Sequence, residues 1–184
     1  MLKHPAISET ELIQKCKNGD LKYQERLYKH FYGYAMGVGL RYLPNKNDTL
    51  EVVNDAFIKV FKSIAKFDQE SLFKPWFRKI IVNTALKYVQ KKKIVFGEVN
   101  DYSEQAPRID AYAYSNLGEE EILKLVQQLP EGYKLVFNLS VIEGYNHDEI
   151  SKILKIQPGT SRSQLVKARK MLQNQIVNMQ KIAV

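Results

Sequence analysis

The sequence predicts an all-α protein made of two small helical domains. Glycine and proline are scarce, with 9 and 6 copies among 184 residues, so few positions interrupt a helix. Apolar residues recur at spacings of three and four along most of the chain, and the alternation typical of strands is nearly absent. This period lapses between residues 94 and 118. We therefore expect domains at 1–93 and 119–184, joined by a flexible acidic linker at 94–118.

Four helices are expected in the first domain. Ser8 followed by Glu11 has the form of a capping box, in which each side chain satisfies a free backbone N–H at the start of a helix. Proline is tolerated in a first helical turn, which places a helix start at Pro75. The expected helices are one that follows Ser8 and stops at Asn18-Gly19, a second that Asp20 caps and that ends before Pro44, a third from Asp48 to Lys66, and a fourth from Pro75 to Lys92.

The second domain is predicted to begin with two helices that have clear stop signals. Glu119 to Glu121 lie where a helix N-terminus favours negative charge, and Pro130 closes that helix. The next helix, Glu131 to Glu143, ends at Gly144, a residue that readily adopts the left-handed conformation at a helix end.

The last two helices follow the helix-turn-helix pattern. Asn146 and Glu149 form a capping pair that opens a short helix ending at Lys155. After a break at Ile156-Gln157, a second helix starts at Pro158 and carries an apolar stripe along one side. In this motif the second helix enters the major groove of DNA.

The first turns of that final helix are polar and basic, which suits DNA binding. Arg162 and Gln164 can bond base edges bidentately, and Lys167 and Arg169 can neutralise phosphates. The formal charge of +8 favours a polyanionic partner. The alternative is a helical hairpin whose charges are merely solvated. The candidate DNA-binding residues here are Thr160, Ser161, Arg162, Ser163, Gln164, Lys167 and Arg169.

Composition argues against several other classes of protein. Cys16 is the only cysteine, which excludes an intrachain disulfide and a multi-cysteine metal cluster. No apolar run is long enough for a signal peptide or a membrane span, so we expect a cytoplasmic protein without membrane insertion. The three histidines are far apart, and no nucleophile elbow or glycine-rich phosphate loop occurs. We expect no catalytic residue, no metal and no cofactor.

Taken in order, these segments resemble the bacterial sigma factors of the extracytoplasmic-function class, which keep two helical domains of the sigma-70 family. The matching residues of the first domain are Asp48, Glu51 to Phe57, Phe73, Trp76, Phe77, Ile80, Asn83, Ala85 and Lys91 to Lys93. Those of the second are Leu129-Pro130, Val136-Phe137, Leu139, Ile142 to Gly144, Glu149-Ile150, Pro158 to Ser163, Ala168-Arg169 and Leu172. The sequence departs from the family at Leu50, Asn54, Lys87 and Gln157, which weakens single assignments but not the class.

The resemblance implies that the third helix docks on the clamp helices of RNA polymerase. Its polymerase-binding candidates are Asp48, Glu51, Asn54 and Asp55, with Phe57 as neighbouring support. From the residues alone, simple solvated charge explains the same acids.

The resemblance also implies that the fourth helix and the segment from Asp68 to Phe73 recognise and open the minus-ten promoter element. The candidates are Phe73, Trp76, Lys79, Asn83 and Lys87. The last three are four residues apart, so they line one helix face that can follow a single strand. Trp76 also has the spacing of a buried stripe, and Phe73 is the better candidate for a recognition loop.

The same resemblance assigns the minus-thirty-five element to Arg162, Ser163, Gln164 and Lys167. It implies core RNA polymerase and promoter DNA as partners, and an anti-sigma factor that holds the protein inactive. The acids Glu98, Asp101, Glu104 and Asp110 of the linker are expected to thread toward the polymerase channel and mimic nascent RNA.

Two other functions compete with this one. A free-standing helix-turn-helix regulator would use residues 1–93 as a sensor or dimerisation domain. A nucleic-acid-processing enzyme would need clustered carboxylates, whereas Asp48, Glu51 and Asp55 are better explained as the exposed face of one helix.

Overall fold

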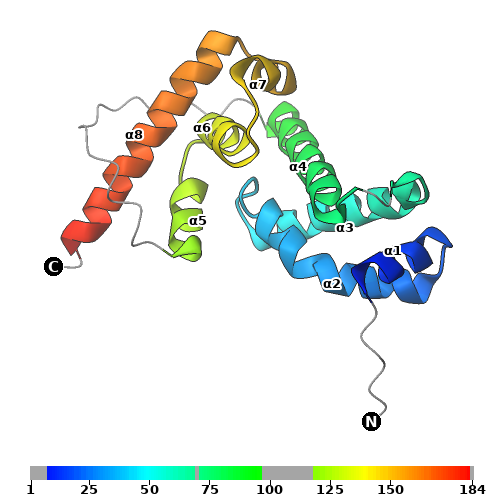
Figure 1. Ribbon diagram of the computed structural model, residues 1–184. Helices are drawn as coiled ribbons and strands as arrows, with labels where there is room; N and C mark the ends of the chain where they lie inside the picture. Colours follow the sequence, from blue (N-terminus) through cyan, green and yellow to red (C-terminus); the bar gives the residue numbers. More distant parts are fainter. Residues whose placement is uncertain (1–7, 69–70, 97–117, 183–184) are drawn as a thin grey trace. The chain divides into compact units, whose positions relative to one another are not determined.

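Figure 1 shows the computed structural model of the chain, which describes residues 8–68, 71–96 and 118–182. Every regular element in these ranges is a helix, which confirms the all-α prediction. The chain divides into two compact units, Met1–Gly97 and Glu98–Val184. The acids expected to thread toward a polymerase channel, Glu98 to Asp110, lie outside the described residues.

The N-terminal unit contains α1 (Glu9–Lys17), α2 (Leu21–Gly39), α3 (Lys46–Ser63), a short 3-10 helix η1 (Ile64–Lys66) and α4 (Phe73–Phe96). Side chains cap the first three helices, since the oxygens of Ser8, Asp20 and Asn45 accept backbone N–H groups of the first turn. The third helix therefore starts at Lys46, two residues before Asp48, because Asn45 Oδ1 accepts the free N–H of Asp48.

Helix α4 is longer than the sequence suggests at both ends. It begins at Phe73, which places Pro75 at its third position. The first four N–H groups of a helix have no intrahelical partner, so a proline there removes no hydrogen bond. The helix also continues to Phe96, into the segment expected to be linker.

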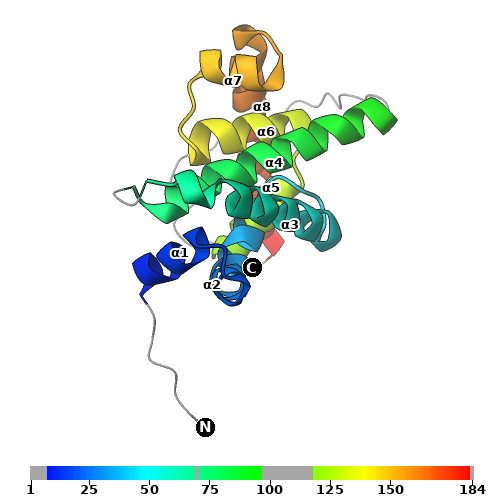
Figure 2. The same ribbon diagram turned by 90° about the vertical axis from the view of Figure 1, so that its right-hand side faces the viewer.

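An aromatic core joins α2, α3 and α4, which cross one another in Figures 1 and 2. The ring centroids of Phe31 and Phe73 are 4.8 Å apart, as are those of Phe57 and Phe77. All four rings are buried. Each such side chain stabilises the fold by about 1.5–3 kcal/mol, so this cluster fixes how the three helices are placed.

The C-terminal unit contains α5 (Glu119–Gln127), α6 (Glu131–Phe137), a π-helical segment η3 (Asn138–Ile142), α7 (His147–Leu154) and α8 (Pro158–Ile182). Its core joins the first helices to the middle of α8, through Leu125, Val126, Leu129, Tyr133, Ala168, Leu172 and Ile176. The sequence predicts a single helix from 131 to 143. In the structure this helix changes from α to π geometry at Asn138, a buried residue. In Figures 1 and 2, α7 lies beside the first turns of α8.

The close approach of α2 to α3 generates a prediction at Gly39. A Cβ built on Gly39 would lie 2.7 Å from Cγ2 of Thr49, a buried residue. We expect Gly39→Ala to lower the free energy of unfolding of the N-terminal unit by about 1–3 kcal/mol, because the overpacked methyl forces the helices apart. Denaturant unfolding followed by fluorescence of Trp76, the single tryptophan, reports on this unit.

Gly33→Ala in the same helix is the matched control. Beyond its chain neighbours and the backbone of its own helix, a Cβ at Gly33 would meet no atom within 4 Å. This substitution should raise stability by about 0.5–1 kcal/mol, because alanine loses less backbone entropy than glycine on folding. Equal effects of the two substitutions would contradict the described packing.

Candidate functional site

The turn between α7 and α8 is built by local capping. Asn146 Oδ1 accepts the N–H groups of Asp148 and Glu149, at 3.0 and 2.9 Å, and Glu149 Oε2 accepts the N–H of Asn146 at 2.8 Å. Lys155 ends α7 in the left-handed region, with φ 56° and ψ 45°. This pair of termini turns the chain sharply, so that α8 starts three residues later.

A polar contact inside the motif holds the two helices together. The Nδ1 atom of His147 and the Oγ atom of Ser161 are 2.8 Å apart in a hydrogen bond. Ser161 is fully buried, so the interpretation of Ser161 as a DNA contact is wrong. It falls on the apolar stripe of Leu165, Ala168 and Leu172, and this spacing could have identified it as an inward residue.

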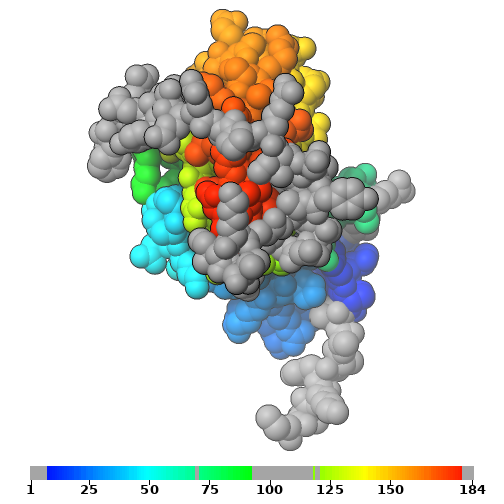
Figure 3. Space-filling view, turned by 90° about the vertical axis from the view of Figure 1, so that its left-hand side faces the viewer, coloured from blue at the N-terminus to red at the C-terminus, as the bar shows by residue number. Residues whose placement is uncertain are grey.

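The outer face of α8 carries most of the other predicted residues. Thr160, Arg162, Ser163, Lys167 and Arg169 are exposed. In Figure 3, the start of α8, in orange, lies at the surface at the top of the view. Lys167 Nζ lies 5.8 Å from the ring centroid of Tyr133, which holds its long side chain over α6.

Besides Ser161, two residues of α8 differ from what the sequence predicts. Gln164 is half-buried, and its Nε2 atom would lie 3.2 Å from a Cβ at Gly132, so its carboxamide rests on α6 instead of extending into solvent. Val166 was missed, although 65% of its surface is exposed. The sequence signal for Val166 was that it is apolar but lies out of phase with the buried stripe of α8. Because it lies three residues after Ser163, it shares the outward face of the helix.

The polar face of α3 is partly as predicted. Glu51, Asn54 and Asp55 are exposed. Phe57 is 2% exposed and has no surface to offer a partner, so the role left to it is the neighbouring support expected from the sequence. It packs under Tyr28, with ring centroids 4.6 Å apart, and the Tyr28 hydroxyl donates to Asn54 Oδ1 at 3.0 Å.

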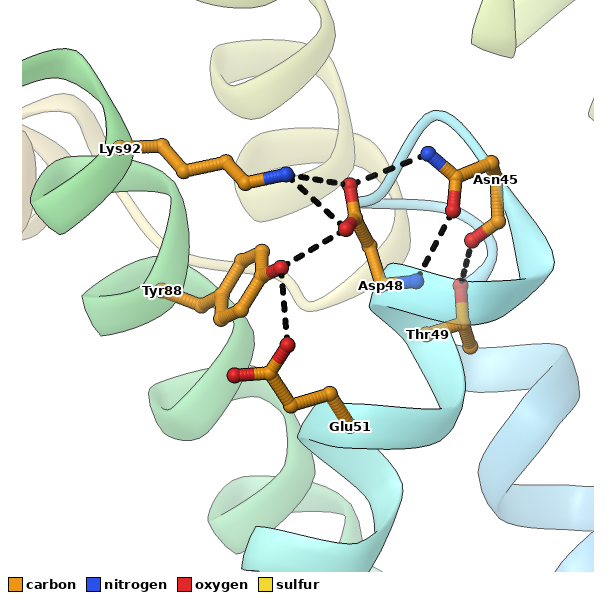
Figure 4. A network of polar contacts seen from close by, with 6 residues as sticks. All are labelled: Asn45, Asp48, Thr49, Glu51, Tyr88 and Lys92. Carbon is orange, nitrogen blue, oxygen red and sulfur yellow. Dashed lines mark hydrogen bonds and ion pairs between the residues drawn. The ribbon is translucent and has the colours of Figure 1, made fainter. Parts of the chain in front are cut away.

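Asp48 belongs to a polar network that joins α3 to α4 (Figure 4). Lys92 Nζ contacts its two carboxylate oxygens at 2.9 and 2.8 Å, and the Tyr88 hydroxyl donates to Oδ1 at 2.7 Å. Asn45 Nδ2 donates to Oδ2 at 3.1 Å. These bonds, that from Lys92 foremost, lower the pKa of Asp48. The side chain is only 14% exposed, so Asp48 joins α3 to α4 and offers little free surface, and its docking contact stays a prediction.

The outward face of α4 carries the three polar residues predicted to follow a DNA strand. Lys79, Asn83 and Lys87 are exposed at successive four-residue spacings. At the start of this strip, Trp76 is half-buried, with its ring centroid 4.8 Å from that of Phe67. An open cavity of about 640 Å³ lies here, lined by Lys66, Phe67, Asp68, Ser71, Leu72, Pro75, Trp76 and Lys79.

Phe73 does not lie in a recognition loop. It is the first residue of α4 and is 2% exposed, so the expected DNA contact is wrong. Its ring contacts Phe31, Trp76 and Phe77, with centroid separations of 4.8, 5.6 and 5.6 Å. Burial of a large apolar side chain outweighs the local preference for a loop before proline.

Comparison with known proteins decides the family. The pattern described as "Sigma-70 region 2" matches residues 27–94, and that described as "Sigma-70, region 4" matches residues 119–172. The chain belongs to the extracytoplasmic-function class of the sigma-70 family. Both described units of this sigma factor therefore contain a region of the family, and the helix-turn-helix of α7 and α8 lies within region 4.

Curated relatives extend the likeness over nearly the whole chain. The ECF RNA polymerase sigma-E factor of Haemophilus influenzae is 28% identical over 182 residues, covering 92% of this chain and 96% of its own. That of Escherichia coli K12 is 26% identical over 183 residues, covering 92% and 95%. The solved sigma factor RpoE of Bartonella quintana, in complex with the anti-sigma factor NepR, has a TM-score of 0.49 and 17% identity, covering 84% of this chain and 96% of that one.

Two further observations concern what the described part of this sigma factor lacks. Within residues 8–68, 71–96 and 118–182, no cluster of three or more His, Cys, Asp or Glu side chains could hold a metal ion. Over the same ranges, none of the helices combines the length and the apolar character needed to cross a membrane.

The turn of the helix-turn-helix motif generates a prediction at Lys155. A residue with a Cβ in the left-handed region is destabilised by about 1–2 kcal/mol, a strain that glycine avoids. Lys155→Gly should therefore stabilise the C-terminal unit by about 1 kcal/mol, after part of the gain is offset by the greater freedom of glycine in the unfolded chain. Hydrogen exchange of amides in α7 and α8 measures the change.

Lys152→Gly is the control for that measurement, because Lys152 is exposed inside α7. Glycine in a helix interior is unfavourable, so this substitution should speed exchange in the same amides. If Lys155→Gly also speeds exchange, the left-handed assignment of Lys155 is contradicted.

The Asp48 network predicts a pH dependence of stability. A carboxyl whose pKa is lowered in the folded state stabilises it above the unfolded pKa, and this contribution is lost as the pH falls through the folded value. Asp48→Asn should lower stability by about 1 kcal/mol at about pH 7, and the difference from the parent chain should vanish in strong acid. Denaturant unfolding at several pH values, followed by Trp76 fluorescence, tests this; a pH-independent difference would contradict it.

Proposed function

We propose that this sigma factor directs core RNA polymerase to specific promoters through three separate helix faces. The outer face of α8 reads the minus-thirty-five element, the outward face of α4 and its adjoining cavity hold the minus-ten strand, and the exposed face of α3 docks on polymerase. The observation that carries the proposal is the exposed polar and basic face at the start of α8, in a helix-turn-helix within family region 4.

At the minus-thirty-five element, α8 combines the two kinds of DNA contact. Arg162 and Ser163 are exposed in its first turns, where side chains of a recognition helix reach base edges. Val166, on the same face, offers an apolar contact to the methyl group of thymine. Lys167 and Arg169 neutralise phosphates and set the register of the helix on the duplex.

At the minus-ten element, the geometry of the outward face of α4 suits a single strand of DNA. Lys79, Asn83 and Lys87 form a strip that follows one backbone, and Trp76 lines a cavity at the end of the strip. Flipping a base costs a few kcal/mol, whereas stacking of a base on an aromatic ring contributes about 1–3 kcal/mol. A base placed against Trp76, together with phosphate contacts from the lysines, therefore offsets the unstacking and holds the opened strand without nucleotide hydrolysis.

On α3, the exposed set of Glu51, Asn54 and Asp55 provides polar and negatively charged groups for the clamp helices of polymerase. The partners of this role are core RNA polymerase, promoter DNA and, as is common in the class, an anti-sigma factor that covers the same surfaces. The role requires no catalytic residue or cofactor from this chain, and it places the protein with the polymerase in the cytoplasm.

The test is run-off transcription from fragmented genomic DNA, with core polymerase and with or without the protein. The expected result is a set of transcripts that depends on the protein and that starts downstream of a shared pair of elements. Retention of the protein by core polymerase on a sizing column should accompany it. Tight promoter binding by the protein alone, without retention or transcripts, would instead indicate a free-standing regulator.

Once the promoter is known, Arg162→Ala should weaken holoenzyme binding to it by about 1–3 kcal/mol and relax the preference at one base position. Arg169→Ala should weaken all sequences alike and reduce the salt dependence of binding, because it removes a phosphate contact. Lys124→Ala, at an exposed site on α5, is the charge-matched control. An unchanged base preference in Arg162→Ala would contradict its assignment.

A further inference from the structure

Tyr88 links two carboxylates of α3 from the neighbouring helix α4. Its hydroxyl lies 2.7 Å from Oδ1 of Asp48 and 3.2 Å from Oε2 of Glu51. Figure 4 shows the ring of Tyr88 pointing across the gap between the helices, with Asp48 and Glu51 on the facing turns of α3. Both acids are therefore within reach of one hydroxyl group.

The two carboxylates are not equivalent. A phenol has one proton to donate at a time, so the Tyr88 hydroxyl is shared between its two acceptors at 2.7 and 3.2 Å. Asp48 is also bonded to Lys92 and Asn45, so its oxygens are well supplied with donors. Within the described residues, Tyr88 is the only hydrogen-bond partner of the Glu51 side chain. Glu51 is thus held in place while most of its acceptor sites stay open to an incoming donor.

The charge balance of the cluster favours a cationic visitor. Lys92 supplies one positive charge against the two carboxylates of Asp48 and Glu51, and it is bonded to Asp48. Asp55, one turn after Glu51, is a second exposed acid on the same side of α3. An arginine or lysine side chain that approaches this face therefore meets the Glu51 carboxylate, which forms no ion pair within the described residues.

We propose that Tyr88 is a positioning residue for polymerase docking, and that it aims Glu51 at a basic side chain of the polymerase. The proposal rests on the docking role of α3 given above. A free glutamate side chain loses rotamer freedom when it is bound, and Tyr88 removes part of that loss before the partner arrives. Tyr88 itself does not touch the polymerase.

The test measures the affinity of the full chain for core polymerase in the absence of DNA. Tyr88→Phe removes the hydroxyl and keeps the ring, so we expect affinity to fall by about two- to tenfold, the range for one side chain that must be immobilised on binding. Glu51→Gln should weaken binding at least as much and reduce its salt dependence. Tyr88→Phe combined with Glu51→Ala should bind no more weakly than Glu51→Ala alone, because alanine removes the acceptor through which Tyr88 acts.

Tyr34→Phe is the matched control. The Tyr34 hydroxyl makes a long contact of 3.5 Å with the Lys74 carbonyl oxygen, and the substitution should leave affinity unchanged. Unchanged affinity in Tyr88→Phe would overturn the proposal. It would also be overturned if Tyr88→Phe lowered affinity equally in the parent chain and in a chain without Glu51, because that result would indicate a structural role through Asp48. Failure of the unaltered chain to bind core polymerase would overturn the docking role as well, so the two failures are distinguishable.

Discussion

The burial of one face of each working helix is the constraint on which the three surfaces depend. Helix α8 packs Leu165, Ala168 and Leu172 into the core of its unit, and this fixes the opposite face as the one that carries Arg162 and Ser163. In the N-terminal unit, the aromatic core between α2, α3 and α4 acts in the same way. The apolar packing on the buried side of each helix therefore decides which residues face outward on its other side.

Polar contacts between helices refine what the apolar packing begins. The bond between His147 and Ser161 joins α7 to the first turn of α8. The Tyr28 hydroxyl orients Asn54, and the Asp48 network connects α3 to α4 near the basic end of α4. Each of these contacts uses a residue that sequence patterns present as a surface group. Each contact joins a helix that carries exposed candidate residues to the helix packed beside it.

Helices and their apolar faces could be predicted from the sequence, because the period of apolar residues and the capping residues are local signals. The helix-turn-helix followed from the same signals, whereas the strip of α4 came from the family resemblance and the four-residue spacing of its members. The burial of Phe73 could not be judged in this way, since it depends on which helices lie opposite, whereas the spacing of Ser161 and Phe57 with neighbouring apolar residues indicates inward positions. Asp48 shows the limit most clearly, because its partners Tyr88 and Lys92 lie some forty residues away in the chain.

The most direct measurement is photocross-linking from single positions of α8 in the assembled holoenzyme bound to its promoter. A photoreactive side chain at position 166, where Val166 is exposed, should cross-link to the minus-thirty-five DNA. The same group at position 176, where Ile176 is buried in the core, should not. Cross-linking from position 176 but not from position 166, in a folded protein, would contradict the assignment of the outward face of α8 as the surface that reads DNA.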